Sequence, residues 1–303
     1  MPALRLTTLA LLATLAAGLP PLATPALAQD RERTAIVSAL DRSGAPVDSL
    51  APTDLTIRED GRAREVLRVA PADEPMQIAV LVDNAQHSRV IMLDLRMALR
   101  DFVTALTAPH EAGWRNEVAL ITLADRPTIA QGYTTDRARL LSATDRLFAI
   151  PDSGTLLLDA IMDTARGFSK RGARRPVIVA ITHEGSELSL VHPDQILSAI
   201  TTNSIALHAI VVGRAEPPVS DEDRSRAIVL DRVPAASGGR HTSLITSMAL
   251  KTELASLASE LLHQFAVTWV HPTSLLPPEK TVFGSARDGL TIRGTASKEQ
   301  ARR

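Results

Sequence analysis

The chain has 303 residues, a formal net charge of −1 at pH 7 and no cysteine. The lack of cysteine excludes disulfides, thiolate metal sites and cysteine nucleophiles. The near-balance of charge gives no electrostatic reason to expect nucleic acid or an anionic membrane as a partner. Aromatic residues make up only 3% of the chain, which argues against stacking platforms for sugars or bases.

Residues 1–28 have the pattern of a secretory signal. Arg5 supplies the positive start, LTTLALLATLAAGL is the apolar run, and Ala-Leu-Ala at 26–28 is a small-residue cleavage site. A membrane-spanning helix is the alternative, but the run is shorter than the roughly 20 apolar residues that a span needs, and prolines interrupt it. A lipoprotein anchor would need a cysteine at the cleavage point. We therefore expect export to the periplasm or outside the cell, without membrane insertion after cleavage.

Residues 29–74 are expected to form a small β region. Apolar and polar residues alternate at 34–41 and 54–60, as in half-buried strands, and glycine-containing turns follow each segment. A further strand is predicted at 64–70. The proline-containing and acidic segment at 71–75 is interpreted as a linker.

Residues 75–272 alternate buried strands with amphipathic helices. Strands are expected at 77–83, 117–124, 175–183, 205–213 and 266–271, with a short extended piece at 126–133, and helices at 90–106, 136–150, 153–170, 192–204 and 244–265. This order predicts an α/β fold with a doubly wound, mostly parallel sheet covered by helices on both faces. In such sheets ligands bind beyond the carboxyl ends of the strands, where Asp83 and His183 fall.

Two segments outside this pattern complete the expected organisation. The charged, proline-containing stretch at 213–226 shows no periodicity and is expected to be a mobile loop. Residues 273–303 return to alternation and turns, and their strands are expected to pair with the N-terminal ones. The two terminal segments would then form a small β domain beside the α/β domain at 75–272.

Five segments resemble the von Willebrand factor A domain, and more narrowly a bacterial secreted subgroup in which a small β region precedes that domain. They are 40–69, MQIAVLVDNAQHS (76–88), SGTLLLDAI (153–161), RPVIVAITHEGSELS (175–189) and LASELLHQFAVTWVHP (257–272). No single segment is highly specific, but all five occur in the expected order. The resemblance implies a Rossmann-like fold and a role in protein interaction.

The resemblance also implies a metal-ion-dependent adhesion site at the carboxyl edge of the sheet. In such sites a first loop Asp-x-Ser-x-Ser, a threonine on a second loop and an aspartate on a third supply oxygen ligands to Mg²⁺. Here Asp83 matches the first aspartate and Thr155 the threonine, but Ala85 and His87 stand at the serine positions and His183 at the third-loop aspartate. We therefore predict a degenerate site.

Two interpretations of the remaining oxygen atoms stay open. Ser88 and Glu184 each lie one residue from a ligand position, so a site with shifted ligands would use Asp83, Ser88, Thr155 and Glu184. Alternatively, Asp83 and Thr155 hydrogen-bond the loops above the sheet without any metal, since loop N–H groups can satisfy a carboxylate.

The two histidines are unusual for this resemblance. If the three loops converge, His87 and His183 face the crevice beside Asp83, and the three side chains form a set that suits Zn²⁺, Ni²⁺ or Cu²⁺ better than Mg²⁺. A pH-dependent binding surface is another hypothesis, because imidazoles change charge near neutral pH. The simplest interpretation is two exposed loop residues.

No motif in the chain indicates catalysis. There is no Gly-x-Ser-x-Gly, the His-Glu pair at 183–184 lacks the second histidine of His-Glu-x-x-His, and the glycine-containing loops lack a P-loop lysine. Ser153, His183 and Asp83 form a triad only on paper. The basic run at 170–176 is interpreted as a solvated turn, with a partner-docking patch as the alternative.

The sequence thus favours an exported, non-catalytic module that binds a partner protein in the cell envelope or outside the cell, with little or no help from metal. The expected contact residues are Asp83, His87, Thr155, His183 and Glu184. No cofactor is expected. The first alternative is a metal-dependent adhesion domain that holds Mg²⁺ or another divalent cation through the shifted ligands. The second is an enzyme of unknown type. The sequence indicates no oligomeric state.

Overall fold

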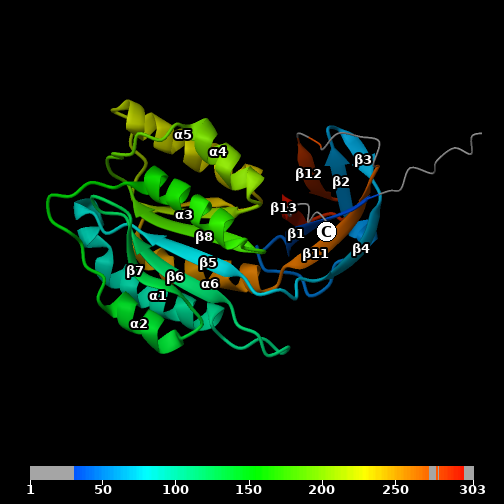
Figure 1. Ribbon diagram of the computed structural model, residues 1–303, viewed down its shortest axis with the longest axis horizontal. Helices are drawn as coiled ribbons and strands as arrows, with labels where there is room; N and C mark the ends of the chain where they lie inside the picture. Colours follow the sequence, from blue (N-terminus) through cyan, green and yellow to red (C-terminus); the bar gives the residue numbers. More distant parts are fainter. Residues whose placement is uncertain (1–30, 273–277, 279, 297–303) are drawn as a thin grey trace, which may run out of the picture.

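The computed structural model describes residues 31–272, 278 and 280–296, so the expected signal segment at 1–28 lies outside the described residues. Within them the chain forms a larger α/β unit and a smaller β unit, which lie end to end in Figure 1. None of the helices in the described part combines the length and hydropathy needed to cross a membrane.

A six-stranded sheet with the order β10-β9-β8-β5-β6-β7 forms the centre of the larger unit. Its strands are β5 (Gln77–Val82), β6 (Glu117–Thr122), β7 (Thr128–Thr134), β8 (Pro176–His183), β9 (Ala206–Val212) and β10 (His241–Leu244). All neighbours pair in parallel except β7, which pairs antiparallel with β6. The three middle strands β5, β8 and β9 are buried almost throughout, because helices cover both of their faces.

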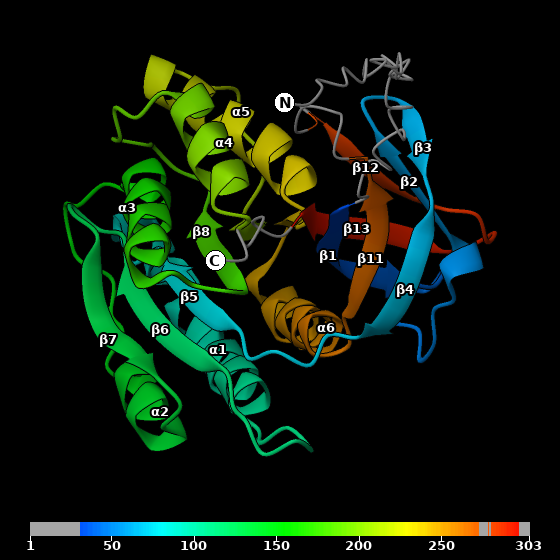
Figure 2. The same cartoon turned by 45° about the vertical axis from the view of Figure 1, so that its right-hand side comes forward.

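Six helices cover this sheet, three on each face (Figure 2). One face carries α1 (Met92–Leu106), α2 (Arg137–Asp145) and α6 (Leu250–Leu262), and the other carries α3 (Leu157–Arg171), α4 (Pro193–Thr202) and α5 (Asp221–Ala236). Each set packs aliphatic side chains onto the sheet in a cluster of its own. The predicted doubly wound, mostly parallel α/β architecture is therefore confirmed.

The smaller unit consists of two antiparallel sheets, with the orders β13-β1-β11-β4 and β12-β2-β3. Their strands are β1 (Arg31–Leu40), β2 (Leu55–Glu59), β3 (Arg62–Arg64), β4 (Val66–Pro71), β11 (Phe265–His271), β12 (Thr281–Ser285) and β13 (Thr291–Ala296). The late strand β12 pairs with β2, and β13 pairs with β1. The prediction that the two terminal segments build one β unit is therefore confirmed.

The strand at the end of the 75–272 segment differs from expectation. β11 lies between β1 and β4 in the smaller unit and takes no part in the large sheet. Its buried side chains Phe265, Val267 and Trp269 complete the core of that unit, which explains the alternation of burial along the strand. The α/β unit accordingly ends with α6.

A carboxylate is buried beside this core. Glu59 accepts hydrogen bonds from Trp269 Nε1 at 2.9 Å, Arg64 Nε at 2.7 Å and His271 Nδ1 at 2.7 Å. Burial raises the pKa of Glu59, but the hydrogen bonds from His271, Trp269 and Arg64 outweigh it and hold the pKa below its usual value. Each oxygen atom of the Glu59 carboxylate therefore has at least one hydrogen-bond donor.

Two further elements correct the sequence analysis. The helix predicted at 244–265 is shorter, because Leu244 ends β10, which pairs with β9 along the sheet edge, and α6 begins only at Leu250. The segment 213–226 is only partly a loop, since α5 begins at Asp221 and is capped by Ser220 and Asp223.

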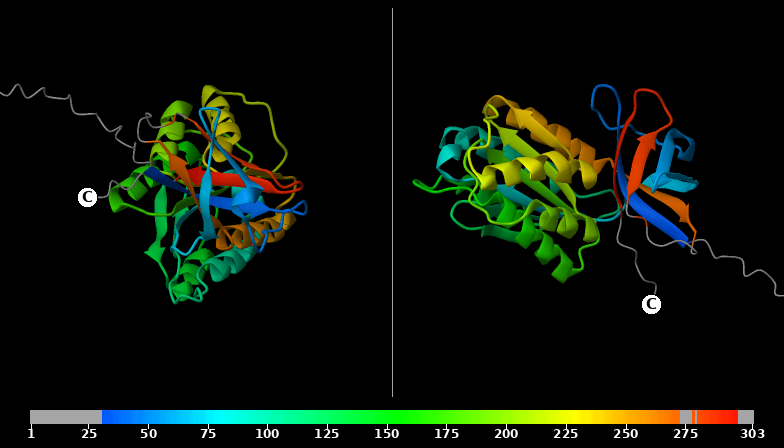
Figure 3. Two further views of the ribbon diagram at one scale, coloured as in Figure 1. Left: turned by 90° about the vertical axis from the view of Figure 1, so that its right-hand side faces the viewer. Right: turned by 90° about the horizontal axis from the view of Figure 1, so that it is seen from above.

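Arg175 fastens the two units together. Its guanidinium is buried and donates hydrogen bonds to the carbonyls of Ala72 and Glu74 in the linker and to Leu261 O and Gln264 Oε1 at the end of α6. Burial lowers the pKa of Arg175 to about 10, so it remains charged at neutral pH. These contacts lie at the amino ends of the sheet strands, so the carboxyl ends point away from the smaller unit (Figure 3).

Candidate functional site

Three connections meet beyond the carboxyl ends of β5, β6 and β8. We refer to residues 83–91 as the first loop, 146–156 as the second loop and 184–192 as the third loop. The first and second loops are joined by Asp152 N, which donates to Gln86 Oε1 at 2.6 Å. The second and third are joined by Leu188 N, which donates to Thr155 O at 2.9 Å. The predicted convergence of the three turns is therefore present.

Asp83 is the centre of this convergence. Its carboxylate accepts hydrogen bonds from Thr155 Oγ1 at 3.1 Å, Thr182 Oγ1 at 2.8 Å, the amide of Ala85 at 2.9 Å and the amide of His183 at 3.3 Å. Both oxygen atoms thus have donors from separate segments. Asp83 joins the first and second loops to the end of β8, from which the third loop begins, as the scaffold interpretation predicts.

The predicted contact residues divide by their exposure. Asp83 is 1% exposed and Thr155 6%, so neither can touch a partner in this arrangement. His87 is exposed, whereas His183 and Glu184 are partly exposed. A partner protein that docks on these loops can contact His87, His183 and Glu184. Asp83 would influence such a partner only by holding the loops in position.

The two histidines do not form a metal set with Asp83. His183 Nδ1 lies 2.6 Å from Glu184 O, which as a carbonyl accepts a hydrogen bond from it, and His87 packs against Gly185. In the described ranges, no group of three or more histidine and acidic side chains is arranged to hold a metal ion. The hypothesis of a zinc-type set of His87, His183 and Asp83 is therefore not supported by the geometry.

Ser88 retains one oxygen without a partner. It lies in the short 3₁₀ turn Gln86–Val90. Among the described residues its fully buried hydroxyl has no hydrogen-bond partner, although its amide donates to Ala85 O at 2.9 Å. A buried hydroxyl without a partner costs free energy.

Replacing Ser88 with alanine is therefore expected to raise the free energy of unfolding by about 1 kcal/mol, because it removes an unsatisfied polar atom from the interior. Urea denaturation of wild type and Ser88→Ala measures the change. A lower stability in the variant, seen only when Mg²⁺ or Mn²⁺ is present, would instead make Ser88 a metal ligand.

The sequence analysis missed Arg226, which lies on α5 and reaches the third loop. It is 7% exposed. Its NH1 lies 3.3 Å from Glu184 Oε2 and 3.3 Å from Gly185 O, and its NH2 lies 3.0 Å from His183 O and 3.4 Å from Thr182 Oγ1. Arg226 and Glu184 are 42 residues apart, so their contact leaves no local pattern in the sequence. The one available signal was the capping box at Ser220 and Asp223, which places Arg226 on a helix.

Glu187 is the second missed residue. It is buried, and its carboxylate accepts hydrogen bonds from the amides of Ser189 and Leu158, while Ser189 Oγ accepts from the amide of Asp159. The third loop thus caps the N-terminus of α3, which has no side-chain cap of its own. Burial raises the pKa of Glu187 to about 7 against these hydrogen bonds.

Apolar side chains surround these loops on the outside. The five most exposed large apolar residues among those described are 78–86% exposed, and all lie in connections at the carboxyl edge: Val90, Leu190, Val219, Ile245 and Met248. Leu93, Phe148 and Leu188 are further exposed residues in or beside the same connections. Large apolar side chains exposed along one edge of a domain are typical of surfaces that bind another macromolecule.

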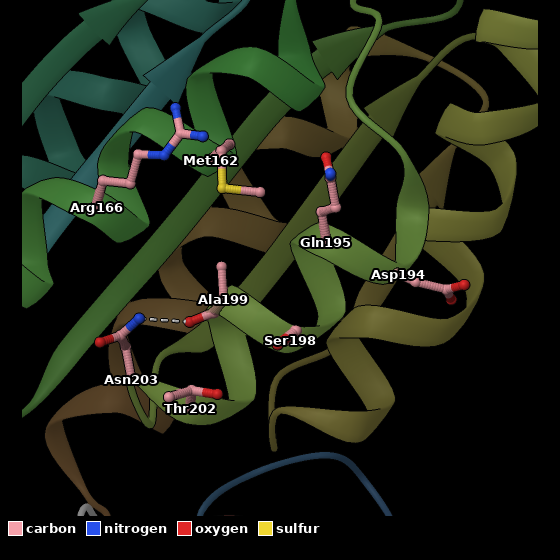
Figure 4. A pocket seen from close by; sticks show the side chains of 8 residues that line it. All are labelled: Met162, Arg166, Asp194, Gln195, Ser198, Ala199, Thr202 and Asn203. Carbon is pink, nitrogen blue, oxygen red and sulfur yellow. Dashed lines mark hydrogen bonds between the residues drawn. The ribbon is translucent and has the colours of Figure 1, made fainter.

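A separate pocket of about 590 Å³ lies between α3 and α4, lined by Met162, Arg166, Asp194, Gln195, Ser198, Ala199, Thr202 and Asn203 (Figure 4). It contains none of the loop residues described above. Asn203 Nδ2 donates to Ala199 O at 2.7 Å, and Arg166 pairs with Asp163 outside the pocket. Among the lining residues, all of them in the described part of the chain, no hydrogen bond joins the hydroxyl of Ser198 or Thr202 to the carboxylate of Asp194.

Comparison with solved structures identifies the fold. A von Willebrand factor type A protein from Catenulispora acidiphila is similar with a TM-score of 0.50 and 12% sequence identity, over 88% of this chain and 62% of that one. The chain has the von Willebrand factor A fold. No family model matches the sequence, and no curated protein is significantly similar to it.

Two other A-fold structures are similar at lower scores. Proximal thread matrix protein 1 from the mussel byssus has a TM-score of 0.49 and 13% identity over 67% of this chain, which spans about half of the mussel protein (49%). BatB from Bacteroides thetaiotaomicron has a TM-score of 0.43 and 15% identity, over 62% of this chain and 99% of that one.

The A fold raises the question of a metal ion, and the residues of this chain do not fit one. Ala85 offers no side-chain oxygen, and the His87 side chain lies against Gly185. Both oxygen atoms of Asp83 already accept hydrogen bonds, and Glu184 faces the guanidinium of Arg226. Mg²⁺ requires near-octahedral oxygen ligands at short distance, which this set does not offer.

Proposed function

We propose that this protein is an exported, non-catalytic interaction module that binds a partner protein in the cell envelope or outside the cell. The contact surface lies at the carboxyl edge of the A-fold sheet and consists of the exposed parts of the three loops with the β9–α5 and β10–α6 connections. Binding requires no metal ion.

The exposed apolar side chains carry this proposal. Val90, Leu190, Val219, Ile245 and Met248 come from four different connections, yet all lie at one edge of the sheet. Water-facing apolar side chains stabilise nothing in the free protein, whereas a partner that covers them gains the free energy of their burial. His87, His183 and Glu184 supply polar contacts beside them, as a polar rim does in protein interfaces.

A capture experiment from the envelope fraction tests the surface. Wild-type protein, Leu190→Asp and Val90→Asp serve as baits, and Ile129→Asp is the matched control, because Ile129 is also exposed but lies on the edge strand β7. We expect the two loop variants to lower capture of the specific partner about tenfold and the control to leave it unchanged. Equal capture by all four baits would place the surface elsewhere.

Calorimetric titration with Mg²⁺, Mn²⁺ and Zn²⁺ separates this proposal from the metal-dependent alternative. We expect no heat of binding and no thermal shift in the free protein. Partner capture should also be unchanged by EDTA. Loss of capture with EDTA, restored by Mg²⁺, would favour an adhesion domain that uses Asp83, Ser88, Thr155 and Glu184.

A further inference from the structure

We infer that Arg226 provides, as a guanidinium tethered to α5, the positive charge that holds the third loop in place beside Asp83. The loops at the carboxyl edge then keep one arrangement without a divalent cation. The inference concerns the free protein, and it goes beyond the proposed function because it does not depend on any partner.

Several oxygen atoms surround the guanidinium of Arg226. Its two terminal nitrogens contact the carboxylate of Glu184, the carbonyls of His183 and Gly185, and the hydroxyl of Thr182 at 3.0–3.4 Å. Carboxylate, carbonyl and hydroxyl oxygens are also the ligands that hard cations prefer. A planar guanidinium can serve several of them at once through its fork of donors.

The hydroxyl of Thr182 connects this group of oxygen atoms to Asp83 at the centre of the site. Thr182 Oγ1 accepts from Arg226 NH2 and donates to Asp83 Oδ2 at 2.8 Å. The positive charge is thus one hydroxyl away from the buried carboxylate of Asp83. Within the described part of the chain, no other basic side chain pairs with Glu184.

The helix that bears Arg226 is itself fixed to the same loop. One turn earlier, Asp223 Oδ1 accepts a hydrogen bond from the amide of Glu187 at 2.9 Å, while Asp223 also caps α5 with Ser220. Residues three apart lie on one helix face, so Asp223 and Arg226 grip the third loop together. The backbone that bears Arg226 is therefore already held beside the third loop, which lowers the entropic cost of its contacts.

Without the guanidinium of Arg226, the oxygen atoms around it would face one another. Glu184 Oε2, two carbonyl oxygens and the Thr182 hydroxyl would share a partly buried space without the donors that Arg226 supplies, which is unfavourable. The third loop would then open toward water, or a small soluble cation would enter. A third loop held by the guanidinium should therefore not respond to added metal. A third loop that has lost the guanidinium should be stabilised by it.

Hydrogen–deuterium exchange of the purified protein tests this. We expect Arg226→Met to speed exchange of the amides at 182–190 about tenfold or more, while amides in β5 stay protected. Arg226→Lys keeps the charge but cannot serve four oxygens, so it should give an intermediate rate. Arg224→Met is the matched control and should behave as wild type. Arg224 is exposed on the same helix and, within the described ranges, forms an ion pair with Asp221 alone.

Added cations complete the test. We expect wild-type exchange and melting temperature to be unchanged by EDTA or millimolar Mn²⁺, whereas Mn²⁺ or methylguanidinium should partly restore protection at 182–190 in Arg226→Met. If that variant does not fold, Arg226→Lys decides by the same measurement. Wild-type exchange at 182–190 in either variant would overturn the inference, and so would a wild-type protein that EDTA loosens. Because no partner is present, neither result depends on the proposed function.

Discussion

Replacing Glu59 with alanine is expected to lower the free energy of unfolding by about 3–5 kcal/mol, because it removes one partner from a buried, charged network. The Trp269 indole, the His271 imidazole and the Arg64 guanidinium would each lose an acceptor inside the smaller β unit. Urea denaturation followed by tryptophan fluorescence measures the loss, since Trp269 lies in this core.

Glu65→Ala is the matched control, because Glu65 is an exposed glutamate between β3 and β4 of the same unit and should change stability by no more than about 0.5 kcal/mol. A Glu59→Ala variant as stable as the control would mean that the hydrogen bonds of Glu59 contribute little beyond the cost of burying its charge.

The same network predicts a pH dependence. Because the folded pKa of Glu59 lies below its usual value of 4.5, the folded state favours the ionised form. Its contribution to stability is therefore complete above pH 4.5 and is lost as the pH falls through the lower, folded pKa. We expect the stability difference between wild type and Glu59→Gln to shrink over this acid range.

Replacing Asp83 with alanine is expected to lower the free energy of unfolding by about 3 kcal/mol, because several buried donors lose their acceptor together. These are the hydroxyls of Thr155 and Thr182 and the amides of Ala85 and His183. We also expect faster amide exchange in all three loops. Chemical denaturation and exchange mass spectrometry give the two measurements.

Asp163→Ala serves as the control for Asp83→Ala, since Asp163 is exposed on α3 and pairs only with the exposed Arg166. A loss confined to metal-containing buffer would contradict the scaffold role of Asp83. An unchanged stability in every buffer would mean that the loops converge without its help.

The sequence predicts the fold where burial leaves a local pattern. β5, β8 and β9 are almost uninterrupted apolar runs because both faces of the sheet are covered, and that pattern is readable in one segment at a time. β10 was missed because His241–Leu244 is a short edge strand with partial burial, so no periodicity distinguishes it from the start of the next helix. β11 was predicted as a strand, but its sheet depends on partners more than 190 residues away in the chain.

The site was predictable only in part, for the same reason. Asp83 and Thr155 follow from their positions at the ends of recognisable segments, and the structure brings them together. The contacts of Arg226 and Glu187 join elements that are distant in sequence, and a buried arginine in a charged helix start has the same local pattern as a solvated one. The exposure of Val90 and Leu190 likewise appears only when the sheet is assembled.

The order of the strands constrains how the chain reaches its native state. The Trp269 indole meets Glu59 across 210 residues, and the entire α/β unit is inserted between them. Joining two such distant segments in an unfolded chain carries a large entropic penalty, which falls once the inserted unit is compact and holds its own ends close. We therefore expect the smaller unit to form after the inserted α/β unit has become compact.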